Sequence, residues 1–170
     1  MLRRSALLLL PLTLGLAACG PRGVQAPDAY DVSGTVSGDW GTGPMLRLAL
    51  VGSGFPSVVT NESGRAQTPF PANGNPWTFG FDLPNVPGVF GVYQIVAYND
   101  ANNNAQYDIG ESFARNSQWL IYSSVGGNVP ATQVTPELNV EQGWNVYDRR
   151  AGTLRPGPPS EKITGYDISR

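Results

Sequence analysis

The strongest period-two pattern in the chain lies at residues 77–83, and it constrains the fold more than any other feature. The apolar side chains of this segment alternate with small or polar ones, and they are Trp77, Phe79, Phe81 and Leu83. Such alternation puts apolar side chains on one face of an extended strand, whereas a helix needs them three or four residues apart. The segment therefore predicts a strand with one buried face, with Trp77, Phe79 and Phe81 in the core.

Further segments with strand patterns lie between glycine-rich turns, at residues 30–37, 45–51, 92–98, 118–122, 138–140 and 144–147. Residues 92–98 are apolar on both faces apart from Gln94, which is typical of a central strand. No segment shows a convincing helical periodicity. About seven strands at this spacing predict an all-β fold, an antiparallel β-sandwich.

The chain contains no histidine, and this absence removes several classes of chemistry. Ser-His-Asp and Cys-His nucleophile systems, histidine-ligated zinc and the usual general base near neutral pH are all excluded. Carboxylate chemistry of the glycosidase type remains, and the candidate pairs are Asp82 with Asp100 and Glu137 with Glu141. Because nothing around these acids raises a pKa or shapes a cleft, we expect no enzymatic activity.

The N-terminus carries the zones of an export signal. Two arginines precede an apolar stretch at residues 6–18, which is shorter than the roughly 20 residues of a membrane-spanning helix. The stretch ends in LAAC at residues 16–19, which resembles the lipobox of bacterial lipoproteins. The resemblance implies that residues 1–18 are a signal peptide, that Cys19 carries acyl chains, and that Gly20 after it favours the outer membrane over the inner one. The alternative is an ordinary secretory signal that happens to hold a cysteine.

Composition divides the remaining chain into three parts. Residues 19–29 are small, polar and proline-containing, and we expect a lipidated tether there. The sandwich domain is expected at residues 30–148, followed by a proline- and glycine-rich C-terminal tail at residues 149–170. Within this tail, residues 163–168 are compatible with a short terminal strand and with a loose end.

The charge of the chain limits its partners. The formal net charge is −2, and removal of residues 1–18 leaves nine basic and 13 acidic residues, a net charge of −4. A nucleic-acid partner would require a basic face, so we expect no nucleic-acid binding. The expected partners are the membrane, reached through the lipid anchor, and an envelope protein or polysaccharide.

Residues 100–111 read DANNNAQYDIGE, and oxygen-bearing side chains recur in this run at defined positions. The first, third, fifth, ninth and twelfth positions are Asp100, Asn102, Asn104, Asp108 and Glu111, and the seventh is Gln106 with its backbone carbonyl. This is the spacing of a twelve-residue calcium loop, in which the last carboxylate binds the ion with both of its oxygens. We therefore expect a structural Ca²⁺ held by these residues, with a dissociation constant of roughly 10⁻⁴ to 10⁻³ M. The alternative is a solvated turn, since Asn, Asp and Gly are the common turn residues.

This loop differs from an EF-hand in its flanks and at one position. An EF-hand has a helix on each side, whereas predicted strands at residues 92–98 and 118–122 flank this loop. Ala105 stands at the sixth position, where a calcium loop has Gly because the backbone takes a positive φ. Alanine in the left-handed region costs on the order of 1 kcal/mol. The prediction is therefore an EF-hand-like loop that stiffens a connection between strands.

The strand that leads into the loop adds a family resemblance. Residues 91–98 read GVYQIVAY and run directly into the Asp- and Asn-rich loop ending in Gly-Glu. This arrangement resembles the prealbumin-like and Cna-B-like sandwich domains of bacterial surface proteins. The resemblance covers residues 91–111. It implies an immunoglobulin-like or prealbumin-like sandwich with an adhesive, sugar-binding or structural role, and it carries no catalytic residues.

One aromatic residue stands out as a candidate for ligand binding. Trp40 lies in the glycine-rich turn GDWGTG, where we expect it to have little to pack against. For Trp119 and Trp144, core and binding roles both stay open. The expected function is a lipid-anchored cell-envelope protein with a structural or interaction role, stabilised by the calcium loop. The alternative is a carbohydrate-binding module of the cell surface.

Overall fold

The computed structural model describes residues 26–53, 59–60, 70–71, 76–84, 88–108 and 110–170. The predicted signal peptide, Cys19 and most of the predicted tether lie outside these residues. The one helix among the described residues is a short 3₁₀ helix, η1 (Pro27–Ala29). In the same ranges, no helix has the length and apolar character needed to cross a membrane.

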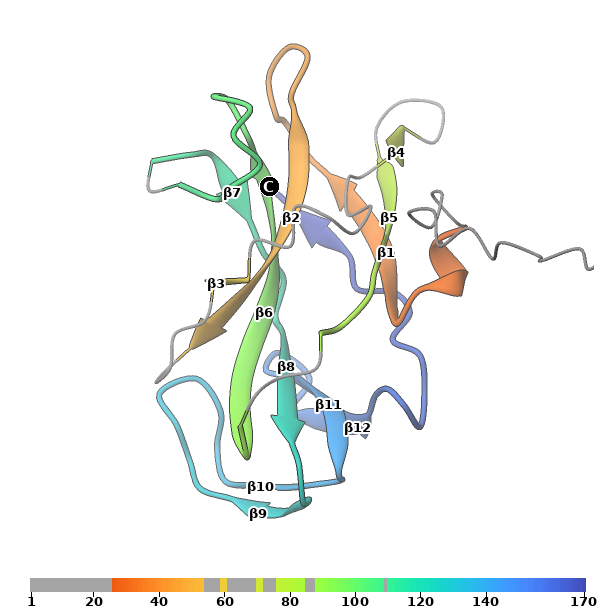
Figure 1. The fold of residues 1–170 in the computed structure, drawn as a ribbon, viewed down its shortest axis with the longest axis vertical. Helices are drawn as coiled ribbons and strands as arrows, with labels where there is room; N and C mark the ends of the chain where they lie inside the picture. Colours follow the sequence, from red (N-terminus) through yellow and green to blue (C-terminus); the bar gives the residue numbers. More distant parts are fainter. Residues whose placement is uncertain (1–25, 54–58, 61–69, 72–75, 85–87, 109) are drawn as a thin grey trace, which may run out of the picture.

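A large sheet forms one layer of the molecule, with the strand order β12-β11-β8-β6-β2-β3 and with β7 paired to β6 (Figure 1). These strands are β2 (Leu46–Ser53), β3 (Val59–Thr60), β6 (Phe90–Asn99), β7 (Phe113–Ala114), β8 (Gln118–Ser123), β11 (Gly143–Asp148) and β12 (Thr153–Pro156). All of their pairings are antiparallel. The longest strand, β6, is flanked by β2 and β8, as expected for a segment that is apolar on both faces.

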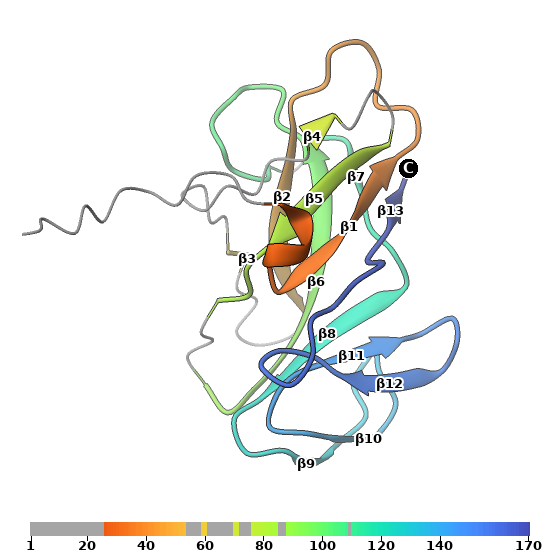
Figure 2. The ribbon, with the colours of Figure 1, turned by 90° about the vertical axis from the view of Figure 1, so that its right-hand side faces the viewer.

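A smaller sheet with the order β13-β1-β5-β4 forms the second layer (Figure 2). Its strands are β1 (Val32–Ser37), β4 (Phe70–Pro71), β5 (Trp77–Phe81) and β13 (Ile168–Ser169). Strand β1 pairs antiparallel with β5 and parallel with β13. A separate hairpin of β9 (Gly127–Val129) and β10 (Leu138–Val140) lies beside the large sheet.

The two sheets enclose one hydrophobic core. The small sheet contributes Val32, Val36, Phe79, Phe81 and Ile168, and the large sheet contributes Leu46, Leu48, Leu50, Tyr93, Ile95, Ala97, Leu120, Trp144 and Val146. The period-two pattern of β5 places Phe79 and Phe81 in this core, and Trp77 packs against it half-buried. The prediction of an all-β antiparallel sandwich is confirmed.

The outer face of the large sheet, which points away from the small sheet, is partly covered. A second apolar cluster lies there under the β9–β10 hairpin, and it consists of Ile121, Val129, Val140 and Tyr147. The loop between β6 and β7 lies toward the other end of this sheet, away from the hairpin (Figure 1). Between these two coverings, described residues of the outer face line a pocket.

The predicted division between a domain ending at residue 148 and a tail at residues 149–170 is wrong. Ile163, Tyr166 and Ile168 are all fully buried in the core, and β12 and β13 extend the two sheets. The prolines and glycines of this segment exclude a helix, but they do not prevent irregular chain from packing between strands. The sandwich therefore includes the C-terminal segment, and the short terminal strand is present as β13.

Two close contacts fix this segment against the rest of the domain. The Tyr166 hydroxyl donates a hydrogen bond to the Gln118 carbonyl at 2.9 Å and accepts one from the Ile95 backbone N–H at 3.2 Å. On the other side, a Cβ at Gly34 would lie 2.4 Å from the Tyr166 carbonyl oxygen, so only glycine fits there. Tyr166 thus connects the small sheet to two strands of the large one.

Candidate functional site

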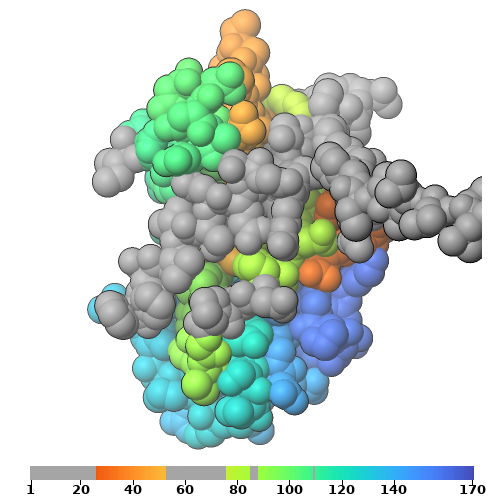
Figure 3. All heavy atoms as spheres, in the orientation of Figure 1, coloured from red at the N-terminus to blue at the C-terminus, as the bar shows by residue number. Residues whose placement is uncertain are grey.

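The loop at residues 100–111 begins where β6 ends and projects from one edge of the molecule (green, upper left in Figure 3). Its start is fixed to β2 and to the chain before β7. The Asp100 backbone N–H donates to the Met45 carbonyl, and the Asn99 N–H donates to the Ser112 carbonyl, both at 2.9 Å. The predicted strands on both sides of the loop are therefore present, and the ends of the loop are held by the sheet.

Asp100 is the best-anchored residue of the loop, and its side chain is fully buried. Its Oδ1 accepts a hydrogen bond from the Asn104 N–H at 3.0 Å, and its Oδ2 accepts one from the Ala105 N–H at 2.9 Å. Arg47 on β2 donates from Nε to the same Oδ2 at 2.5 Å and from Nη2 to the Asn103 Oδ1 at 3.1 Å. A guanidinium group thus neutralises the first carboxylate of the loop.

The backbone between Asp100 and Asp108 winds through successive side-chain turns. The Asn102 Oδ1 accepts from the Asn104 N–H at 3.1 Å, and the Asn104 Oδ1 accepts from the Gln106 N–H at 2.7 Å. Asn103 and Ala105 both take positive φ angles, of 55° and 61°. Ala105 therefore adopts the left-handed conformation that a calcium loop requires at its sixth position, despite its Cβ.

The second half of the loop turns its carboxylates back toward this winding. The Asp108 Oδ2 accepts hydrogen bonds from the side-chain amides of Asn102 and Asn104, at 2.9 and 2.7 Å. These two bonds lower the pKa of Asp108, so its charged form is favoured. The Glu111 Oε2 accepts from the Asp108 N–H at 3.0 Å, whereas the Glu111 Oε1 is buried without a hydrogen-bond partner.

The donor set fits a hard cation in its chemistry. Carboxylate, amide and carbonyl oxygens are the ligands of Ca²⁺, and the unpartnered Glu111 Oε1 is an oxygen that an ion would satisfy. Across the described residues, however, no three His, Cys, Asp or Glu side chains gather as a metal-binding group. Ion binding in this loop would therefore depend on the amide oxygens of Asn102 and Asn104 as well as on its carboxylates.

The prediction that Trp40 is an exposed binding residue is wrong. Its side chain is only 4% exposed and belongs to the core between the sheets. The indole Nε1 donates to the Ser37 carbonyl at 3.0 Å, and the guanidinium of Arg170 lies 5.5 Å from the ring centroid. The C-terminal segment thus supplies the packing that the local sequence around Trp40 lacks, and Trp40 presents no face to a ligand.

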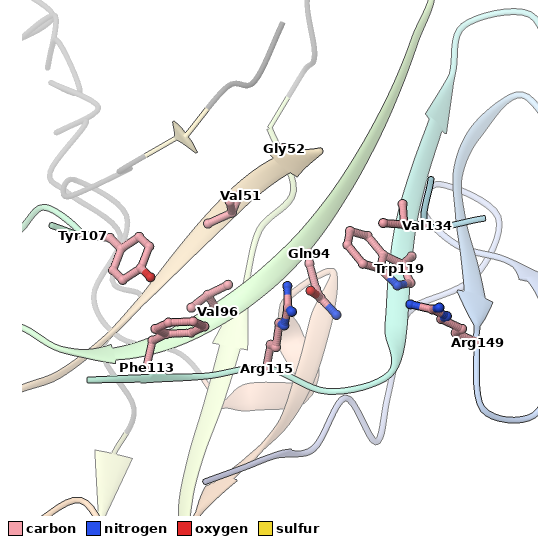
Figure 4. Close-up of a pocket in the computed structure, with 10 residues that line it drawn as sticks. All are labelled: Val51, Gly52, Gln94, Val96, Tyr107, Phe113, Arg115, Trp119, Val134 and Arg149. Atoms are coloured by element: carbon pink, nitrogen blue, oxygen red, sulfur yellow. The ribbon is translucent and has the colours of Figure 1, made fainter. Parts of the chain in front are cut away.

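A different aromatic residue, Trp119, lines an open pocket on the outer face of the large sheet (Figure 4). This outer-face pocket has a volume of about 320 Å³ and is lined by Val51, Gly52, Gln94, Val96, Tyr107, Phe113, Arg115, Trp119, Val134 and Arg149. Trp144, the other tryptophan whose role was open, lies in the core beside Tyr93 and Tyr122.

Sequence reasoning missed the three arginines that matter most at these two places. Arg47 meets Asp100 from 53 residues away, and Arg115 and Arg149 come together only because β8 and β11 are neighbours. No local spacing signals either arrangement. The alternation of β2 predicts only that Arg47 points to the face opposite Leu46 and Leu48.

The chain matches no protein-family model, no curated protein and no solved structure. Its class therefore rests on the fold and the loop. It is an all-β sandwich in which a loop rich in oxygen-bearing side chains connects two strands of the large sheet.

Proposed function

We propose that this protein is a non-catalytic, lipid-anchored component of the cell envelope with a structural or interaction role. Acylated Cys19 would hold it in the membrane, with the outer membrane as its destination in a cell that has two. The loop at residues 100–111 would bind one structural Ca²⁺. The sandwich would then present its outer face to another envelope component, either a protein or a polysaccharide.

The observation that carries the calcium part is the agreement between backbone and side chains in the loop. The positive φ of Ala105 falls at the sixth position, and the buried, unpartnered Oε1 belongs to the Glu111 at the twelfth. The ion would be held by Asp100, Asn102, Asn104, Asp108, Glu111 and the Gln106 carbonyl. It would offset the repulsion between carboxylates and hold the loop in one conformation.

We expect calcium to raise the melting temperature of the protein. For a dissociation constant of roughly 10⁻⁴ to 10⁻³ M, about 10 mM Ca²⁺ adds about 1.4 to 2.7 kcal/mol of stability. Glu111→Gln should lose most of this gain, because it removes the charge of the twelfth ligand. Thermal melting in Ca²⁺ and in chelator measures both effects.

The exposed Glu161 provides a matched control, since it lies outside the loop and Glu161→Gln makes the same change in charge. Asp100→Ala is a weaker test, because it also removes the acceptor for Asn104, Ala105 and Arg47. Equal melting temperatures of the unmodified protein in Ca²⁺ and in chelator would contradict the metal site.

Arg47 is expected to oppose calcium binding while stabilising the ion-free loop. Its guanidinium donates to Asp100, a proposed ligand of the cation, and to Asn103, so it lies close to the proposed site. Arg47→Gln should therefore raise calcium affinity by roughly tenfold, since like charges this close repel by on the order of 1 kcal/mol. The same variant should melt earlier than the unmodified protein in chelator.

Calcium titration followed by calorimetry checks the affinity, with Arg150→Gln as a control of equal charge away from the loop. An Arg47→Gln variant with unchanged affinity would show that the guanidinium and the cation do not share Asp100.

A further inference from the structure

The outer-face pocket carries positive charge in a protein that is acidic overall. None of its ten lining residues is acidic, and two of them are Arg115 and Arg149. In the part of the chain that the structure describes, the single ion pair joins Arg47 to Asp100, so neither pocket arginine is paired with a carboxylate there. Two unpaired guanidinium groups at one pocket favour an anionic ligand. The planar arrangement of their N–H donors allows each to form two hydrogen bonds to a carboxylate.

Gln94 supplies a fixed polar group at the floor of the pocket. Its side chain is 3% exposed, and its amide nitrogen donates to the carbonyls of Asn116 and Gln118, at 2.7 and 3.4 Å. These two bonds orient the amide so that its oxygen is left to accept a hydrogen bond. In Figure 4, Arg115 lies beside Gln94, and the guanidinium of Arg149 points toward Trp119. The pocket thus combines cationic donors with an acceptor suited to a hydroxyl group.

The remaining lining is largely apolar and includes Val96, Phe113 and Trp119. Phe113 is 46% exposed, whereas Phe79 and Phe81 are buried, and its ring meets that of Tyr107 edge-on at a centroid distance of 5.6 Å. The volume of about 320 Å³ lies at the lower end of the range for small-molecule sites, which suits a single ring. Apolar side chains can contact the carbon face of such a ring while its polar substituents meet the arginines and Gln94.

We propose that the outer-face pocket binds a carboxylate-bearing sugar unit, such as a uronic acid within an acidic polysaccharide. Arg115 and Arg149 pair with the carboxylate, Gln94 accepts a hydrogen bond from a hydroxyl group, and Trp119 contacts the ring. The chemistry of the ligand is inferred from the pocket alone. That the ligand comes from the cell envelope rests on the proposed function.

The position of the pocket argues against a peptide as the occupant. It lies on a face of the large sheet, and its lining includes side chains of β2, β6 and β8 and of the short strand β7. Among these strands, β7 pairs on one side in the described residues, and its two residues offer few backbone groups to an added peptide strand. The ligand must be recognised by side chains, as a sugar ring is.

The calcium loop forms one wall of this pocket. Tyr107, the eighth residue of the loop, lines the pocket, and its ring lies 5.4 Å from that of Tyr98 on β6. If the loop binds Ca²⁺, the ion will hold this wall in place and strengthen sugar binding. The arginines lie outside the loop, so charge recognition does not require the ion.

Titration of the full chain with trimers of glucuronate and of mannuronate tests the proposal. We expect at least one trimer to bind, and its methyl ester to bind at least tenfold more weakly because the ester removes the negative charge. Arg115→Gln and Arg149→Gln should each weaken binding by about tenfold, which corresponds to 1.4 kcal/mol. Arg150→Gln, next to Arg149 but outside the pocket, should stay within about twofold. Shifts of the Trp119 indole N–H signal in NMR spectra place the ligand.

Three results would overturn the proposal: no binding of either trimer, equal binding of acid and ester, or tighter binding of a peptide with a free carboxylate. Each titration is run in excess Ca²⁺ and in chelator, alongside the melting experiment. Sugar binding without any calcium effect on the melting temperature would support the sugar site and contradict the calcium site. A calcium effect on melting without sugar binding would support the calcium site and contradict the sugar site.

Discussion

Ending the chain after Ser160 is expected to abolish folding of the domain. The deletion removes Ile163, Tyr166 and Ile168, which are all fully buried in the core. Truncating one such side chain costs about 2 to 5 kcal/mol, and the total stability of a domain is only about 5 to 15 kcal/mol. Loss of the dispersed NMR signals and of a cooperative thermal transition would show the unfolding.

A single substitution in the same segment gives a measurable loss of stability in a protein that still folds. Tyr166→Phe keeps the ring but leaves the Ile95 N–H without its buried partner, and it leaves the Gln118 carbonyl with only the 3.4 Å bond from Gln94. We expect a loss of about 1 to 3 kcal/mol, measured by denaturant unfolding. The exposed Ser169→Ala should have little effect. A shortened chain that still melts cooperatively at the temperature of the full chain would contradict the assignment of this segment to the core.

Gly34→Ala is expected to have the largest effect of any single methyl group added to β1. The new Cβ would meet backbone, the Tyr166 carbonyl oxygen at 2.4 Å and its carbon at 2.6 Å, and backbone cannot rotate away as a side chain can. Overpacking of this kind costs about 3 kcal/mol, which lowers the melting temperature by roughly 6 to 12 °C. Differential scanning calorimetry measures the shift.

Ser33→Ala is the matched control, because its backbone N–H still donates to the Ile163 carbonyl and no Cβ is added. It should melt within a few degrees of the unmodified protein. If both variants have the same melting temperature, the C-terminal segment moves to make room for the new methyl group. Its contact with β1 is then less rigid than the distances indicate.

The strand pattern was predictable because it is local. Alternation at residues 77–83 and the two-sided apolar run at 92–98 determine β5 and the middle of the large sheet without knowledge of their partners. The C-terminal segment was not predictable in the same way. Ile163 and Tyr166 lie outside any regular strand, and the backbone of Tyr166 packs in space left by Gly34, about 130 residues earlier in the chain.

In the candidate sites, too, local contacts could be predicted from the sequence and tertiary contacts could not. The side-chain turns of the loop follow from the spacing of Asp100, Asn102 and Asn104, because each amide or carboxylate bonds a backbone N–H a few residues on. The ion pair of Asp100 with Arg47 is a tertiary contact, so it could not be predicted from that spacing. Trp40 shows the opposite error, since its polar and glycine-rich neighbours indicated exposure while distant residues buried it.

The parallel pairing of β1 with β13 also has a mechanical consequence. Strand β1 lies between β13 and β5, and the chain enters it from the side of the proposed lipid anchor. A force applied along the axis of β1 would load its hydrogen bonds to both neighbours together, instead of opening them one at a time.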